Sequence, residues 1–154
     1  MDRVNRAAVA LGSNVGDRGG HLAYAVSRLA DYFTSLKVSR SVTTAPVNVP
    51  GDQPDFLNAA VVGETTLGPR ALLDTLLAIE RERGRERPFP GAARTLDLDL
   101  ILFADRIISE PGLLVPHPRF RERRFVLAPL AEIAPDLVDP VTGQTVEELL
   151  GAIG

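Results

Sequence analysis

The spacing of hydrophobic residues along the chain predicts an alternation of strands and helices. Apolar residues are continuous over residues 7–11, which indicates a buried strand. They then recur every three or four positions from Leu22 to Phe33, which indicates an amphipathic helix. A second helical pattern begins at Pro69, where the first turn of a helix tolerates proline, and ends at Gly84. Three further segments have the composition of strands: residues 38–46, 57–66 and 96–103.

These elements follow one another in the order strand, helix, strand, strand, helix, strand. That order predicts an α+β fold of the ferredoxin-like kind, in which an antiparallel sheet carries its helices on one face. Two shorter helical patterns, over residues 125–134 and 146–150, would add C-terminal elements to this β-α-β-β-α-β core. Because the chain has 154 residues, 45% of them hydrophobic, we expect a single domain over residues 1–154.

The composition excludes several kinds of protein. The chain has no cysteine, so it has neither a disulfide framework nor a thiolate metal site, and any metal must bind oxygen or imidazole ligands. No segment approaches the roughly 20 consecutive apolar residues that a membrane helix requires. We therefore expect a cytoplasmic protein without a membrane partner.

The positive charge is concentrated in one part of a chain whose net charge is −3. Residues 81–124 contain 10 arginines and 7 acidic residues, whereas residues 125–154 contain 5 acidic residues and no basic one. The planar guanidinium group fits phosphate oxygens, so an arginine cluster within an acidic protein indicates a phosphorylated small ligand. Nucleic acid is not expected as a partner, because proteins that bind it are more often basic overall.

The most informative residues for chemistry are Asp97 and Asp99, within residues 94–99 (RTLDLD). Alternation along a strand places both aspartates on the same face, with Cα atoms about 6.5–7 Å apart. Such a pair can bind divalent ions that neutralise a polyphosphate and stabilise its attacking and leaving oxygens. The alternative is a half-exposed strand whose aspartates face water, although aspartate is uncommon in strands.

Basic residues lie on both sides of this pair in the sequence. Those before it are Arg85, Arg87 and Arg94, and those after His117 are Arg119, Arg121, Arg123 and Arg124. Metal ions on the two aspartates, together with arginines on the phosphates, would form the electrostatic clamp that phosphoryl transfer requires. For Arg81 and Arg83 we favour the alternative of a solvated helix end with salt bridges.

Three further features fit this chemistry but also have ordinary explanations. His117 lies between two prolines that restrict the backbone and hold its ring where it can contact a phosphate, although a lone histidine in a loop is more often a surface residue. The Gly-Ser-Asn sequence of residues 12–14 follows a strand and opens a helix, where backbone amides often bind an anion. Phe56, Asn58 and Phe125 are suited to stacking on a flat heterocycle and hydrogen bonding to it, although phenylalanine is usually a core residue. His21 is interpreted as structural or exposed.

Together these segments resemble one family, the 6-hydroxymethyl-7,8-dihydropterin pyrophosphokinases of folate synthesis, nearly from end to end. The matching segments are residues 10–14 (ALGSN), 52–60 (DQPDFLNAA), 79–80 (IE), 84–85 (GR), 94–99 (RTLDLD), 115–117 (VPH), 123 (R), 125 (F) and 129–130 (PL). The run over residues 94–99, at this distance from the others, is highly specific.

The resemblance implies an enzyme, a 2-amino-4-hydroxy-6-hydroxymethyldihydropteridine diphosphokinase. It would transfer the β,γ-diphosphate of ATP directly to the hydroxymethyl oxygen of the pterin, leaving AMP, with two Mg²⁺ ions on Asp97 and Asp99. The implied pterin site consists of Thr44, Val47, Phe56, Asn58 and Phe125, with Asn58 reading the ring edge and Phe125 stacking on the ring. The implied ATP site consists of Glu80, Arg85, Arg87, Arg94, His117 and Arg123. Arg85 and Arg94 would stabilise the developing charge, and the family expectation is a monomer.

The sequence departs from the family pattern at two places. Members often have Trp-Gly-Pro-Arg where this chain has GAAR over residues 91–94, so the stacking tryptophan is absent. Leu114 and Pro118 stand where some members have polar contacts to ATP.

Two other functions stay open from the residues alone. A two-metal nucleotidyltransferase or nucleotide hydrolase would use the same aspartates but would not require residues 52–60. A non-catalytic nucleotide-sensing module would require neither clustered carboxylates nor so many arginines. The general base is also open, because Asp97 is the nearest acidic candidate but a metal-bound carboxylate is a poor base.

Overall fold

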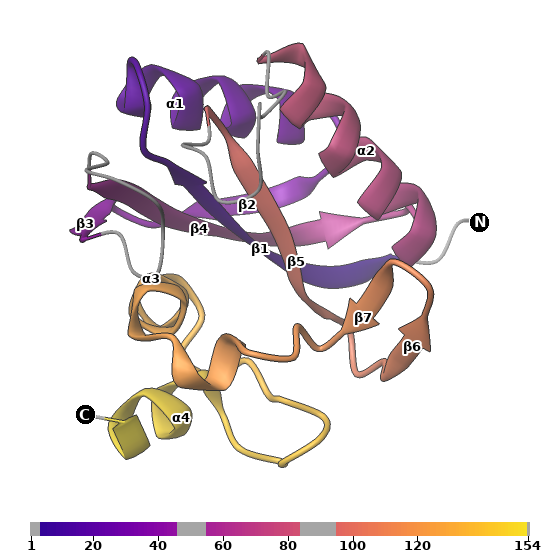
Figure 1. Ribbon diagram of the computed structural model, residues 1–154. Coiled ribbons are helices and arrows are strands. Elements are labelled where there is room, and N and C mark those ends of the chain that lie inside the picture. The colour runs from indigo at the N-terminus through magenta and orange to yellow at the C-terminus, as the bar shows by residue number, and fades with distance from the viewer. Residues whose placement is uncertain (1–3, 46–54, 84–94, 154) are drawn as a thin grey trace.

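The computed structural model describes residues 4–45, 55–83 and 95–153, which form helices around an antiparallel sheet (Figure 1). The sheet has the strand order β2-β4-β1-β5, and β3 also pairs with β4. Its strands are β1 (Asn5–Ser13), β2 (Thr34–Val38), β3 (Val42–Thr44), β4 (Phe56–Thr65) and β5 (Asp97–Phe103). The predicted combination of helices with an antiparallel sheet is confirmed.

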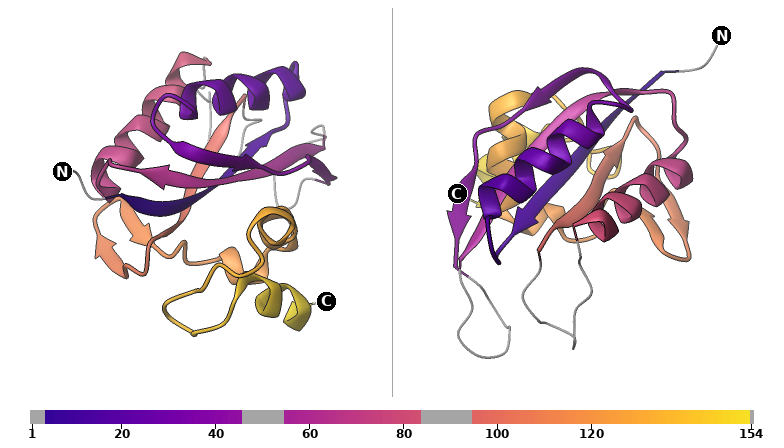
Figure 2. Two further views of the ribbon diagram at one scale, coloured as in Figure 1. Left: turned by 180° about the vertical axis from the view of Figure 1, so that it is seen from behind. Right: turned by 90° about the horizontal axis from the view of Figure 1, so that it is seen from above.

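Helices cover both faces of the sheet. α1 (Arg18–Leu29) and α2 (Pro69–Glu82) lie across one face, while α3 (Arg124–Ile133) and α4 (Val146–Ile153) lie on the opposite side (Figures 1 and 2). α1 begins after Asp17, whose carboxylate accepts a hydrogen bond of 3.1 Å from the backbone N–H of Gly20. α2 has Pro69 in its first turn, as predicted. The two predicted C-terminal helices thus form a separate layer.

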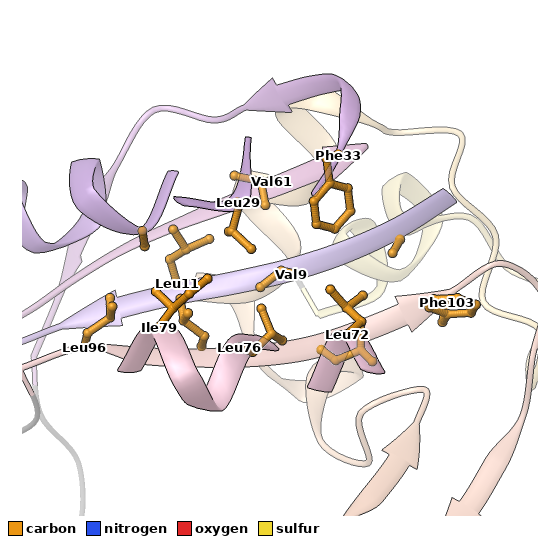
Figure 3. Close-up of a cluster of buried hydrophobic side chains, with 14 of the residues drawn as sticks. Val9, Leu11, Leu29, Phe33, Val61, Leu72, Leu76, Ile79, Leu96 and Phe103 are labelled. Carbon is orange, nitrogen blue, oxygen red and sulfur yellow. The ribbon is translucent and has the colours of Figure 1, made fainter. Parts of the chain in front are cut away.

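One hydrophobic cluster fills the space between the sheet and each pair of helices. In the cluster beneath α1 and α2, Val9 of β1 packs with Leu29, Leu72 and Leu76 of the helices, and all four side chains are fully buried (Figure 3). Burial of each such leucine stabilises the fold by about 1.5–3 kcal/mol. On the other face, small residues such as Ala8 and Ala60 in the sheet pack with α3 and α4. The strands are therefore apolar on both faces near their centre.

A bulge in β5 determines which of its side chains point to which face. Leu100 pairs with Val9 and Leu102 with Ala8, so Ile101 is an extra residue in the register. Leu100 belongs to the cluster beneath α1 and α2, whereas Ile101 and Leu102 both belong to the cluster beneath α3 and α4. By alternation from Leu98 and Leu100, Asp97 and Asp99 lie on the face of α3.

The structure differs from the predicted elements in three places. The helix predicted from Leu22 to Phe33 ends at Leu29, and β2 already begins at Thr34. The strand predicted over residues 38–46 is interrupted, because the side-chain oxygen of Ser39 accepts the backbone N–H of Ala60 (2.9 Å) and separates β2 from β3. A hairpin that was not predicted, β6 (Ile108–Glu110) and β7 (Leu113–Val115), follows β5. It turns at Pro111 and Gly112, where Gly112 has φ +76°, a conformation that favours glycine.

Candidate active site

The two aspartates predicted to bind metal lie at the start of β5, half-buried and on the same face of the sheet. The backbone N–H of Leu98, which lies between them, donates a hydrogen bond of 2.7 Å to the Glu80 carboxylate at the end of α2. β5 is an edge strand of the described sheet, so Glu80 satisfies an amide that has no neighbouring strand. This contact fixes the strand at the point where the aspartates project. It also gives Glu80, predicted to face ATP, a structural partner.

Strand register places two of the predicted site residues in one row: Asn58, predicted for the pterin, and Asp97, predicted for the metal. Gly12 in the central strand β1 pairs with Asn58 of β4 on one side and with Asp97 of β5 on the other. Two strand spacings separate Asn58 from Asp97, a Cα distance of about 10 Å. Gly12 presents no side chain between them, and a Cβ there would lie 3.4 Å from Asn58 Oδ1 and 3.9 Å from Phe56 Cδ1. The backbone at Gly12 therefore forms a flat surface, the Gly12 floor, with Asn58 on one side and Asp97 on the other.

Three of the predicted pterin residues are brought together by the pairing of β3 with β4. Thr44 pairs with Phe56, and the Oγ1 of Thr44 accepts a hydrogen bond of 2.8 Å from Asn58 Nδ2. Asn58 is 6% exposed, and its orientation is fixed by this bond. Among non-neighbouring atoms, its Oδ1 is the nearest to the position that a Cβ on Gly12 would take. A buried amide held in this way can read the edge of a heterocycle.

Phe125 is in the first turn of α3, which packs against β3 and β4. Phe125 is 36% exposed, and the Arg123 guanidinium carbon lies 5.7 Å from the centroid of its ring. The predicted stacking residue and one predicted ATP residue are therefore neighbours. Val47, the remaining pterin residue predicted from the resemblance, lies outside the described residues.

His117 follows the hairpin and is fixed by its backbone. Its N–H donates to the carbonyl of Ile101 in β5 (2.9 Å), and its ring Nδ1 accepts the backbone N–H of Arg119 (3.2 Å). Burial lowers the pKa of His117, and the positive charge of Arg123 lowers it further, while Asp97 opposes both effects. The ring is thus neutral near pH 7. Because Nδ1 accepts, Nε2 carries the proton and can donate to an anion.

A pocket of about 360 Å³ opens between α2, β5 and the hairpin, next to Asp99 and His117. This volume is at the small end of the range for ligand sites. Its walls are largely apolar, and its lining residues are Leu73, Leu98, Asp99, Leu100, Glu110, Gly112, Leu113, Leu114, His117 and Pro118. Sequence reasoning missed the hairpin wall, although the Pro-Gly pair at 111–112 between two apolar runs is a recognisable turn signal.

A salt bridge fixes the hairpin wall to α2. Arg70 Nη2 donates to Glu110 Oε1 and to the carbonyl of Pro111, both at 3.1 Å. Arg70 was not among the predicted site residues. Its contacts connect the first turn of α2 to the tip of the hairpin.

The arginines of the predicted cluster have different roles. Arg121 binds the buried carboxylate of Asp139, and Arg119 lies 3.8 Å from Glu122. Arg83 donates to His21 Nδ1 (3.0 Å) and lies over the Tyr24 ring. Arg123 lies over the Phe125 ring, and its charge lowers the pKa of His117. The remaining arginines predicted to bind ATP, Arg85, Arg87 and Arg94, lie outside the described residues.

The possible metal ligands are oxygen atoms. Within residues 4–45, 55–83 and 95–153 no group of three or more His, Cys, Asp or Glu side chains could hold a metal ion. Two carboxylates on one face nevertheless suit Mg²⁺, which binds one or two carboxylates together with phosphate oxygens and water. In the described chain, no helix has the length and apolar character needed to cross a membrane.

A pair of carboxylates and a neutral histidine beside a largely apolar pocket is the arrangement expected of a small-molecule site. Comparison with known proteins agrees and is more specific. Residues 8–135 match the family model described as 7,8-dihydro-6-hydroxymethylpterin-pyrophosphokinase. The chain belongs to this family, which confirms the prediction of family and enzyme class.

Relatives of similar length support the same membership. The chain is 42% identical to the 2-amino-4-hydroxy-6-hydroxymethyldihydropteridine pyrophosphokinase of Pseudomonas aeruginosa over 97% of this chain and 92% of that protein. It is 44% identical to the Bacillus subtilis enzyme of the same name, over 94% of this chain and 87% of that protein.

The fold has a counterpart among solved structures. A Plasmodium falciparum HPPK-DHPS triple mutant with SDX-DHP superposes with a TM-score of 0.78 over 99% of this chain, at 16% sequence identity. This chain spans 44% of the length of that protein. The similarity shows the fold.

Proposed function

We propose that this chain transfers the β,γ-diphosphate of ATP to the hydroxymethyl oxygen of 6-hydroxymethyl-7,8-dihydropterin, giving the pterin diphosphate and AMP. The observation that supports this most is the row Asn58, Gly12, Asp97 on one face of the sheet. In this row Asn58, proposed to hydrogen bond to the pterin, lies about 10 Å from Asp97, proposed to bind metal. Membership of the pyrophosphokinase family supports the same reaction.

The pterin ring is proposed to lie on the Gly12 floor. Asn58, held by Thr44, would hydrogen bond to the ring edge, Phe125 would stack on the face turned away from the floor, and Phe56 would contact the ring beside Asn58. Because the Asn58 amide is already oriented before substrate binds, little conformational entropy is lost on binding.

ATP is proposed to place its nucleoside in the pocket beside β5 and its phosphates toward His117 and the aspartates. The pocket walls include Leu73, Leu113 and Leu114, which suit the flat apolar faces of a base. His117 Nε2–H and Arg123 would donate to phosphate oxygens. Leu114 and Pro118, where some family members have polar contacts, would contribute apolar contact instead.

Two Mg²⁺ ions are proposed to bind at Asp97 and Asp99, and the oxygen-only donors fit them. When bound, such ions would neutralise phosphate charge. The hydroxymethyl oxygen attacks the β-phosphorus in line, so a bond from this oxygen to phosphorus forms. The bond from the β-phosphorus to the oxygen shared with the α-phosphorus breaks, and AMP leaves with that oxygen. The hydroxymethyl proton passes to water, with Asp97 the nearest acidic candidate for a base.

Several finer predictions accompany this function. We propose a ferredoxin-like classification for the core, supported by the strand order β2-β4-β1-β5 and by the two helices that connect these strands on one face. A single domain, a monomeric state, a cytoplasmic location and the roles of Arg85, Arg87 and Arg94 stay predictions.

Replacing single carboxylates tests the site. Asp97→Asn and Asp99→Asn should each reduce AMP formation from ATP, Mg²⁺ and the pterin by more than about 100-fold, because one charged ligand is lost. The control Asp105→Asn changes an exposed acid just beyond the same strand and should retain activity. Retention of activity in Asp97→Asn, with the fold intact by circular dichroism, would refute the metal assignment.

A further inference from the structure

Asp139 is a fully buried carboxylate that the proposed reaction does not use. It lies in the loop between α3 and α4 and is bound at both oxygens by Arg121, with Nε on Oδ2 and Nη2 on Oδ1 at 3.0 Å. The backbone N–H of Val141 (3.0 Å) and the hydroxyl of Thr142 (2.8 Å) complete its partners. Burial alone would raise the pKa of Asp139, but these hydrogen bonds together lower it. The carboxylate is therefore ionised and fully satisfied.

The same loop is closed by backbone hydrogen bonds on Asp139. Its N–H donates to the carbonyl of Gln144 (2.9 Å), and its own carbonyl accepts from Gly143 (2.8 Å). Asp139 is thus held from its backbone as well as its side chain. Arg121 therefore binds a carboxylate whose position is set by the loop.

Arg121 is in the short helix η1 (Phe120–Glu122), which connects His117 to Arg123. The N–H of Phe120 donates to the carbonyl of His117 (3.4 Å), and the N–H of Arg123 donates to the carbonyl of Phe120 (3.2 Å). The Phe120 ring is fully buried in the cluster under α3 and α4, and the Arg121 guanidinium carbon lies 5.0 Å from its centroid. η1 is consequently anchored on two sides.

We propose that Asp139 is a positioning residue for ATP, which acts through Arg121 to hold η1 and so sets the placement of His117 and Arg123. This rests on the proposed function, in which those two residues contact the phosphates. The pairing has a second consequence, because it takes Arg121 out of the cluster of arginines available to phosphate. A bidentate guanidinium–carboxylate pair fixes orientation as well as distance, which suits it to this role.

The test measures the KM of ATP and of the pterin separately. Asp139→Asn keeps the size of the side chain but removes its charge from Arg121. We expect the KM of ATP to rise about tenfold, equivalent to about 1.4 kcal/mol, with the KM of the pterin unchanged. Arg121→Lys keeps the positive charge but loses the two-pronged geometry, so the KM of ATP should rise in the same direction by a smaller factor.

Val146→Ala is the matched control for lost stability. Val146 is fully buried in α4, in the same hydrophobic cluster as Phe120, and its truncation creates a cavity without changing Arg121. All variants are assayed well below their thermal unfolding midpoints. A rise in the KM of ATP in Asp139→Asn and Arg121→Lys, but not in Val146→Ala, supports positioning.

Two results would overturn the proposal. One is an unchanged KM of ATP in Arg121→Lys, which retains charge and is expected to fold even if Asp139→Asn does not. The other is an equal rise in Val146→Ala, which would reduce Asp139 to a stabilising role. Failure of the proposed function is distinguishable, because the unaltered protein would then form no AMP from ATP and the pterin.

Discussion

Gly12→Ala should reduce the catalytic activity of this protein without reducing its stability. Gly12 lies between Asn58 and Asp97 in the row that forms the proposed pterin floor. An added Cβ would lie 3.4 Å from Asn58 Oδ1, 3.9 Å from the Leu57 carbonyl oxygen and 3.9 Å from Phe56 Cδ1, which are ordinary van der Waals distances. The protein itself therefore accepts the methyl group, whereas a flat ring on this floor does not.

The substitution is expected to leave stability unchanged or higher while it lowers activity. Glycine within a strand costs roughly 0.5–1 kcal/mol relative to alanine, so the free energy of unfolding should stay the same or rise by up to about that amount. A methyl group beneath the ring would displace it by about 1 Å, and a misplacement of that size costs about 100-fold in rate. We therefore expect kcat/KM for the pterin to fall about 100-fold.

Gly63→Ala is the matched control on β4. A Cβ there would lie 3.0 Å from Phe33 Cδ1, 3.1 Å from Leu36 Cδ1 and 3.2 Å from the Thr34 carbonyl oxygen, so neighbouring atoms must move. This variant should lose about 1–3 kcal/mol in urea unfolding and keep its kinetic constants. Near-normal kcat/KM in Gly12→Ala, with the variant folded, would refute the proposed floor.

Three further predictions follow from single side chains. Burial and Arg123 lower the pKa of His117, so as pH falls below about 6.5 the unfolded chain binds a proton at this residue before the folded protein does, and the folded protein loses stability. His117→Asn should lose less stability on acidification, as measured by urea unfolding at a series of pH values, and a loss equal to that of the unaltered protein would contradict this prediction. Ser13 is fully buried, and its Oγ has no hydrogen-bond partner in the described structure. Ser13→Ala should therefore raise the free energy of unfolding by about 1 kcal/mol, and a decrease would show that the hydroxyl has a partner. Arg70→Ala, compared with Arg106→Ala at the opposite end of the hairpin, should raise the KM of ATP about two- to fivefold through a looser pocket wall, and equal effects of both would count against this.

The strand that carries the two aspartates proposed to bind metal was predictable because its signal is local. Alternation over residues 96–100 placed Asp97 and Asp99 on one face, and the structure agrees. Alternation alone does not tell which face of the sheet the two aspartates occupy. The face depends on register with β1 and on the bulge at Ile101, and both are set by pairing between residues far apart in the sequence.

The tertiary partners of polar side chains were not predictable for the same reason. Arg121 and Arg123 have the same chemistry and lie two positions apart, yet one binds Asp139 and the other lies beside Phe125. The local spacing contains no information on Asp139, because its approach depends on how the loop before α4 folds back. The hairpin at residues 108–115 differs, since its Pro-Gly turn was visible in the sequence and was overlooked.

Phosphorus NMR of the unaltered protein with ATP and Mg²⁺, recorded with and without 6-hydroxymethyl-7,8-dihydropterin, tests the proposed function most directly. The proposed reaction predicts AMP and a pterin diphosphate when the pterin is present, and unchanged ATP when it is absent. ADP as the nucleotide product would instead indicate an ordinary kinase, and AMP or ADP without pterin would indicate a hydrolase. Unchanged ATP under both conditions would contradict catalysis and favour a nucleotide-sensing module.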